Sequence, residues 1–76
     1  MRRVITVSPV HEGWQVLDGL AEPAPFGSGR QAEQHARALA ESLARDGAPV
    51  EVEIYLRDGA LAARLRYGAP IELEPA

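Results

Sequence analysis

The 76-residue chain contains no cysteine, which excludes disulfides, thiol nucleophiles and cysteine metal sites. It also lacks lysine, since all 8 basic residues are arginine, so a phosphate-loop lysine and a Schiff base are excluded. No apolar run approaches the roughly 18 residues of a membrane-spanning helix. No apolar stretch of about 7–15 residues follows Met1, so we expect no secretory signal, no membrane partner and a cytoplasmic protein.

The composition is that of a folded domain, with 46% hydrophobic and 25% charged residues. The length allows one domain, which we assign to residues 1–68, with residues 69–76 as a C-terminal tail or short edge strand. A core in a chain below roughly 70–80 residues rarely supplies more than about 3–5 kcal/mol of stability. Because disulfides are excluded and no metal site is credible, we expect self-association as a homodimer.

Two segments near the N-terminus, residues 4–9 and 14–18, alternate between apolar and polar residues and predict a β-hairpin. A shift of register by one residue would turn every side chain to the other face of the sheet. A loop with an even number of residues places four apolar side chains on one face: Ile5, Val7, Trp14 and Val16. A two-residue loop over residues 12–13 and a four-residue loop over residues 10–13 both meet this condition.

Residues 19–27 predict a connecting loop, because Pro23 and Pro25 exclude a helix there. Phe26, next to the start of the helix that follows, is expected to fill the end of the core.

The clearest element is a helix that begins after Ser28, an N-cap residue, and ends near Gly47 and Pro49. One face of this helix is apolar and mostly alanine. Its members are Ala32, Ala36, Leu39, Ala40 and Leu43. The opposite face carries charges of alternating sign at four-residue spacing, which is typical of a solvent-exposed face. These are Glu33, Arg37, Glu41 and Arg45.

Residues 50–57 alternate strictly and are followed by Asp58-Gly59, which predicts a two-residue type I′ hairpin turn. That turn sets the register of the second hairpin. The apolar pairs expected on one face are Leu56 with Leu61, Ile54 with Ala63, Val52 with Leu65, and Val50 with Tyr67. The charged pairs expected on the other face are Glu53 with Arg64 and Glu51 with Arg66.

These elements predict an α+β fold in two layers, with the order ββαββ. The sheet is expected to be antiparallel and four-stranded, with one helix packed on one face.

Several short motifs together resemble a family of small bacterial and phage proteins of unknown function. They are Val7-x-Pro9, Gly13-Trp14-x-Val16, Phe26-x-Ser28, Ala32-x-x-x-Ala36-x-x-Leu39-Ala40, Val52-x-Ile54 and Asp58-Gly59. The resemblance covers residues 5–61 and rests mainly on structural positions. It implies no catalytic residues, and the chain from Leu61 onwards is longer than the family pattern leads us to expect.

The sequence supplies no convincing catalytic or metal-binding set. His11 and His35 are the two imidazoles, and a zinc site needs three or four converging ligands. No serine lies in a nucleophile elbow, and a chain of this size encloses little of the cleft that acid–base catalysis requires. Trp14 shares its face with Val16, which favours packing under the helix over a ligand platform. We therefore expect a protein that is not an enzyme and has no cofactor and no metal.

The open face of the sheet is the most informative surface, because it combines an aromatic residue with arginines. The candidates on it are Tyr55, Arg57, Arg64 and Arg66. Such a face can stack the bases of single-stranded RNA, but it can also be a solvated surface or a dimer contact. The net charge of -3 makes nucleic acid the less favoured partner. The tail offers Ile71 and Leu73 as a dimer edge.

From these residues we expect a non-catalytic binding or accessory domain that self-associates, with an unidentified protein partner. The alternative is a weak nucleic-acid-binding module that uses the open sheet face.

Overall fold

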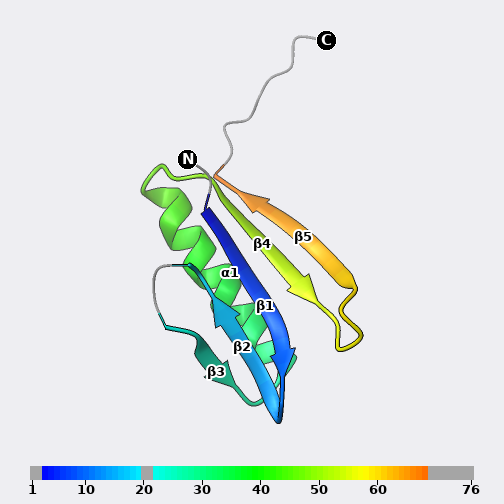
Figure 1. Ribbon diagram of the computed structural model, residues 1–76. Coiled ribbons are helices and arrows are strands. Elements are labelled where there is room, and N and C mark those ends of the chain that lie inside the picture. Colours follow the sequence, from blue (N-terminus) through cyan, green and yellow to red (C-terminus); the bar gives the residue numbers. More distant parts are fainter. Residues whose placement is uncertain (1–2, 20–21, 69–76) are drawn as a thin grey trace.

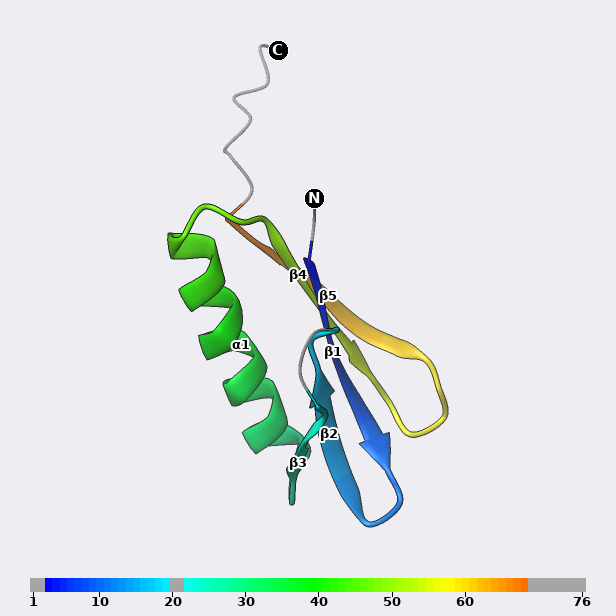
Figure 2. The ribbon, with the colours of Figure 1, turned by 60° about the vertical axis from the view of Figure 1, so that its left-hand side comes forward.

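The computed structural model describes residues 3–19 and 22–68 as one helix packed on a five-stranded mixed sheet. The strands are β1 (Arg3–Val10), β2 (Gly13–Leu17), β3 (Ala24–Phe26), β4 (Val50–Tyr55) and β5 (Leu61–Tyr67), and the helix is α1 (Gly29–Arg45). Their order across the sheet is β3-β2-β1-β4-β5 (Figure 1). Helix α1 covers one face, and the other face is open in the described part of the chain (Figure 2). The predicted tail, residues 69–76, lies outside the described residues.

The expected α+β class and helix-on-sheet arrangement are confirmed, but the four-stranded antiparallel sheet and the order ββαββ are wrong. Strands β1 and β4 pair in parallel, with Arg3 opposite Val50 and Val7 opposite Ile54. The reason is that α1 is a crossover connection, which returns the chain to the end of the sheet where β1 begins. The backbone N–H of Arg3 donates to the carbonyl oxygen of Pro49 at 3.1 Å, so the two strands start side by side.

Strand β3 is the second difference from the prediction. Residues 19–27 were expected to form a loop, yet Ala24–Phe26 pairs with β2, with Pro25 opposite Gln15. A proline cannot donate a backbone hydrogen bond and is therefore confined to edge strands. Pro25 lies in the outermost strand, so it is compatible with this short pairing.

The first hairpin has the even loop that the alternation requires. Val7 lies opposite Val16 and Pro9 opposite Trp14, which is the register of the four-residue alternative. The loop itself has only two residues, 11 and 12, so neither the predicted loop over residues 12–13 nor the one over residues 10–13 has the observed bounds. Gly13 belongs to the strand, opposite Val10, and a Cβ atom at Gly13 would lie only 2.8 Å from the carbonyl oxygen of Phe26. Glycine is therefore needed there for the close approach of β3, and His11 and Glu12 make the turn.

The second hairpin keeps the predicted register from Val50 opposite Tyr67 to Ile54 opposite Ala63. The turn itself is different. The Leu56 N–H donates to the Ala60 carbonyl at 2.8 Å, which leaves a three-residue loop, and Gly59 has a φ of +91°. The Asp58 carboxylate accepts a hydrogen bond from the Ala60 N–H at 2.9 Å. This bond favours the longer loop over a type I′ turn.

A register shift follows from that loop, because Tyr55 lies opposite Leu61 while Ile54 lies opposite Ala63. The predicted pairing of Leu56 with Leu61 is therefore wrong. These two side chains stay 47% and 41% exposed at the tip of the hairpin.

The core lies between α1 and the central strands. Its largest fully buried side chains are Ile5, Val7, Val50 and Val52. They pack against the predicted alanine stripe of α1, namely Ala32, Ala36 and Ala40. Leu39 and Leu43, the two large residues of the predicted apolar face, are only half-buried at the border of this core. The three alanines let α1 lie close to the sheet. The larger Leu39 and Leu43 therefore lie at the sides of the contact between helix and sheet.

Both ends of α1 match the sequence prediction. The Ser28 hydroxyl accepts a hydrogen bond from the Gln31 N–H at 3.2 Å, as an N-cap residue does. At the other end the Gly47 N–H donates to the Ala44 carbonyl at 2.9 Å. The indole of Trp14 lies against Gly29 in the first turn, and Phe26 also packs against the core, so both aromatic residues support the helix as expected.

Candidate functional site

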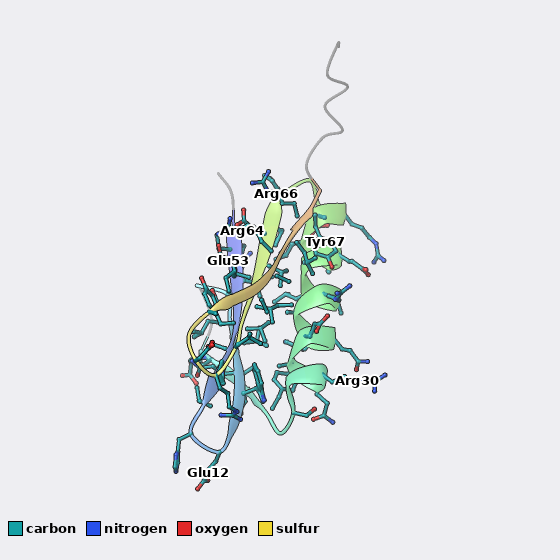
Figure 3. The ribbon with its side chains drawn as sticks, turned by 90° about the vertical axis from the view of Figure 1, so that its right-hand side faces the viewer. Glu12, Arg30, Glu53, Arg64, Arg66 and Tyr67 are labelled. Carbon is teal, nitrogen blue, oxygen red and sulfur yellow. The ribbon has the colours of Figure 1, made fainter. Side chains whose placement is uncertain are left out.

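The open face of the sheet carries a charged group that we name the open-face cluster. It consists of Glu51, Glu53, Tyr55, Arg64 and Arg66 from β4 and β5. Figure 3 shows Glu53 and Arg64 on the side of the sheet away from α1, whereas Tyr67 points toward the helix. Alternation along each strand produces this separation, because successive side chains point to opposite faces.

The arginines of the cluster bind the glutamates across the strands, in the two predicted pairs and also in a diagonal contact between Arg64 and Glu51 that was not predicted. Arg64 Nε lies 2.8 Å from Glu51 Oε2 and 3.4 Å from Glu53 Oε2, and Arg66 Nε lies 3.8 Å from Glu51 Oε1. The neighbouring side chains leave Glu51 only 4% exposed. The arginine side chains remain 47% exposed at Arg64 and 66% at Arg66. The carboxylates are thus the inner part of the cluster, and the guanidinium groups are its outer part.

Tyr55 belongs to the same cluster. Its hydroxyl donates a hydrogen bond to Glu53 Oε1 at 2.9 Å. This bond, together with desolvation and the negative charge of Glu53, raises the pKa of Tyr55 above its ordinary value. Tyr55 is therefore a neutral donor fixed to a carboxylate at neutral pH.

The cluster has two carboxylates and two guanidinium groups, so its formal charges cancel. Glu51 and Glu53 lie beside Arg64, so this face has no surplus of positive charge to attract a phosphate backbone. Nucleic-acid binding relies on a surplus of positive charge over a surface. The geometry of this face therefore gives little support to base stacking and phosphate binding.

The fourth predicted residue of this face, Arg57, does not join the cluster. Its guanidinium carbon lies 5.4 Å from the centroid of the Trp14 ring. Its Nη1 and Nη2 atoms donate to the carbonyl oxygens of Val10 and Gly13 at 3.4 and 3.5 Å. Arg57 thus connects the tip of the second hairpin to the first hairpin. Sequence reasoning missed this contact because no local pattern links residues so far apart in the chain.

Strand β5 is the second candidate site, because it is one outer strand of the sheet and is seven residues long. The other outer strand, β3, has three residues and contains Pro25. Within residues 3–19 and 22–68, no strand pairs with the outer edge of β5. Along it, Arg64 and Arg66 on the open face alternate with Leu65 and Tyr67, which pack against the core. The predicted dimer edge, Ile71 and Leu73, lies outside the described residues.

A small cavity lies between α1 and the strands β2 and β3. Its volume is about 80 Å³, and it is lined by Val16, Asp18, Glu22, Ala24, His35 and Leu39. Pockets for small-molecule ligands usually measure roughly 300–1,000 Å³. The ring of His35 packs 5.0 Å from that of Phe26, and Asp18 binds Arg3 at 3.3 Å. In the part of the chain that the structure describes, no three His, Asp or Glu side chains are placed to hold a metal ion.

Among the described residues, no helix combines the length and the apolar character that crossing a membrane requires. A scan against models of known protein families finds no match, and searches of curated proteins and of solved structures find none either. The resemblance to small bacterial and phage proteins of unknown function therefore stays a prediction.

Proposed function

We propose that this chain is a non-catalytic binding domain that works as a homodimer, and that the two copies meet at the outer edge of β5. The observation that carries the proposal is the contrast between the two edges of the sheet. The edge at β3 is short and contains a proline, whereas β5 offers seven residues. An exposed strand edge presents unpaired backbone N–H and C=O groups, and these groups accept another strand.

The small core supports the same proposal. Four aliphatic side chains of the sheet are fully buried against three alanines of the helix. A domain of this size gains stability by burying further surface in an assembly. The chain has no cysteine for a disulfide and no lysine for a Schiff base, and the cavity between α1 and the strands β2 and β3 is too small for most substrates. A binding role therefore has more support than an enzymatic one, and the lack of cysteine suits the cytoplasm that we propose as its location.

The alternative function, nucleic-acid binding through the open face, has weaker support. Glutamates balance the charges of Arg64 and Arg66, and Arg57 is held by the first hairpin. A nucleic-acid complex would lose affinity steeply as salt rises, since it would depend on phosphate contacts.

Hydrogen exchange at two protein concentrations tests the proposal. We expect the backbone amides of β5 to exchange more slowly at high concentration, while those of β3 stay unchanged and act as the internal control. Slower exchange of amides in β1 and β2, with no change in β5, would contradict a dimer through the β5 edge.

A further inference from the structure

Strand β5 has a side-chain pattern with a complement elsewhere in the chain. From Arg64 to Tyr67 it alternates cationic residues on the open face with apolar residues on the core side. The segment Ile71-Glu72-Leu73-Glu74 alternates with the same period, but with negative charge. We infer that the C-terminal segment of a second copy pairs antiparallel with β5, with Glu72 opposite Arg66 and Glu74 opposite Arg64. The inference rests on the proposed homodimer and names its partner strand.

The register follows from the two faces of the sheet. Residues directly opposite each other in an antiparallel pair point to the same face. With Glu72 opposite Arg66, both apolar pairs fall on the core side: Leu73 opposite Leu65, and Ile71 opposite Tyr67. A shift of one residue would place the glutamates on the core side. A shift of two residues in either direction would keep only one Arg–Glu pair per strand.

The same register closes into a symmetric dimer. If Glu72 of one copy faces Arg66 of the other, then Ala69 faces Ala69, and the reciprocal contacts form at once. An interface with this two-fold symmetry joins two copies and leaves no open end for a third. Each dimer would contain the Arg66–Glu72 contact twice and the Arg64–Glu74 contact twice.

The arginines also disfavour two registers of the simpler alternative, in which β5 of one copy pairs directly with β5 of the other. Centred on Arg64, such a pairing would place Arg64 opposite itself. Centred on Leu65, it would place Arg64 opposite Arg66. Like charges directly opposite each other destabilise a sheet, and charged residues on edge strands prevent such association. A segment with Glu72 and Glu74 opposite these arginines places opposite charges next to each other, so this repulsion does not arise.

The ion pairs within the cluster leave room for a second carboxylate. The shortest contacts of Arg64 and Arg66 with Glu51 and Glu53 involve the Nε atoms. A guanidinium carries five N–H donors in a planar fork, so its outer end can bind a further carboxylate. The side chains of Arg64 and Arg66 are also exposed, so a carboxylate from outside the chain can reach them.

Pro70 favours a second copy over the same chain as the source of the strand. Folding back onto its own β5 in this register would leave residues 68–70 as a three-residue loop. Three-residue hairpin loops commonly need a positive φ at the third position, which Gly59 adopts in the loop before β5. Proline is fixed near a φ of about −65°, so Pro70 cannot take that position. A strand from a second copy needs no turn there.

Charge reversal in the full chain tests the register by analytical ultracentrifugation. Arg66→Glu and Glu72→Arg should each raise the dimer dissociation constant about 10-fold or more, since two attractive contacts per dimer become repulsive. The double variant R66E/E72R should restore dimerisation. Arg30→Glu and Glu12→Arg make the same charge changes at exposed positions and should leave the dissociation constant unchanged.

An introduced cysteine gives an independent measurement, because the chain has none of its own. Ala69→Cys should form a disulfide-linked dimer under mild oxidation, while Ala62→Cys, at an exposed position in β5, should not. A wild-type dimer that ignores both charge reversals, or that the double variant does not restore, would overturn the register and leave the proposed homodimer standing. A wild-type chain that is monomeric throughout would overturn both.

Discussion

The guanidinium of Arg57 lies over the ring of Trp14, 5.4 Å from its centroid, and joins two hairpins that are far apart in the sequence. The indole also packs against Gly29, in the first turn of α1. Trp14 therefore connects the tip of the second hairpin, the first hairpin and the helix. Arg57 therefore stabilises the contact between the two hairpins and is not part of the open-face cluster.

The first prediction concerns this contact. Arg57→Ala removes a cation–π interaction and two long hydrogen bonds, so it should lower the free energy of unfolding by about 1 kcal/mol. Urea denaturation followed by Trp14 fluorescence would measure the loss. Arg30→Ala removes an exposed arginine of α1 and should change stability by less than about 0.5 kcal/mol. Equal effects of the two variants would contradict the assigned role.

The second prediction concerns the loop of the second hairpin. Gly59 has a φ of +91°, which a β-branched residue adopts only with strain, so Gly59→Val should cost about 1–3 kcal/mol of stability. Ala60→Val, at the next position, lacks that constraint and serves as the control. Chemical denaturation with an unchanged midpoint for Gly59→Val would mean that the loop conformation is wrong.

The third prediction concerns the packing of α1 on the sheet. Ala40 is fully buried, so Ala40→Leu overpacks the interface and should cost about 1–3 kcal/mol. Ala38 is exposed on the same helix, and Ala38→Leu should change stability by no more than about 0.5 kcal/mol. Thermal or urea unfolding of both variants compares the two faces directly. A larger loss at Ala38 would show that the helix is rotated.

The fourth prediction concerns the ionisation of Tyr55. Its pKa is raised by the hydrogen bond to Glu53, so Glu53→Gln, which removes a negative acceptor, should move that pKa back toward the ordinary value. Tyr67→Phe leaves Tyr55 as the one tyrosine, and absorbance of its phenolate then follows the titration. An unchanged or increased pKa in Glu53→Gln would contradict the hydrogen bond.

The sign of the linked effect on stability follows from the same shift. A pKa raised in the folded state means that the contribution of Tyr55 is fully present below the pKa of the unfolded chain and is lost as pH rises through the folded-state pKa. The free energy of unfolding should therefore fall in the alkaline range in a Tyr67→Phe background. Adding Tyr55→Phe should remove the part of that fall which Tyr55 causes.

Local patterns were enough to predict several parts of this molecule. The Ser28 cap, the alanine stripe of α1, and the pairing of Glu53 with Arg64 all depend on residues close in sequence or on one hairpin register. The parallel pairing of β1 with β4 was missed, because it depends on where the crossover helix returns the chain. Strand β3 was missed because its proline is typical of a loop, and an edge position that tolerates it cannot be recognised from the sequence.

The candidate site was predictable to a similar extent. Alternation placed Tyr55, Arg64 and Arg66 on one face, and the structure brings them together with Glu51 and Glu53. Arg57 would share that face if the strand pattern continued to it. The three-residue loop ends the pattern first, since the side chain of Asp58 binds the backbone of Ala60. The predicted two-residue turn at Asp58-Gly59 is therefore replaced by a longer loop, which this side-chain hydrogen bond favours.

The molar mass of the full chain in solution tests the proposed homodimer most directly. One chain has a mass of 8.2 kDa. Light scattering coupled to size-exclusion chromatography, run over a range of micromolar concentrations, should give twice that mass at the upper end and a shift toward one chain on dilution. A mass of one chain at every concentration would contradict the account.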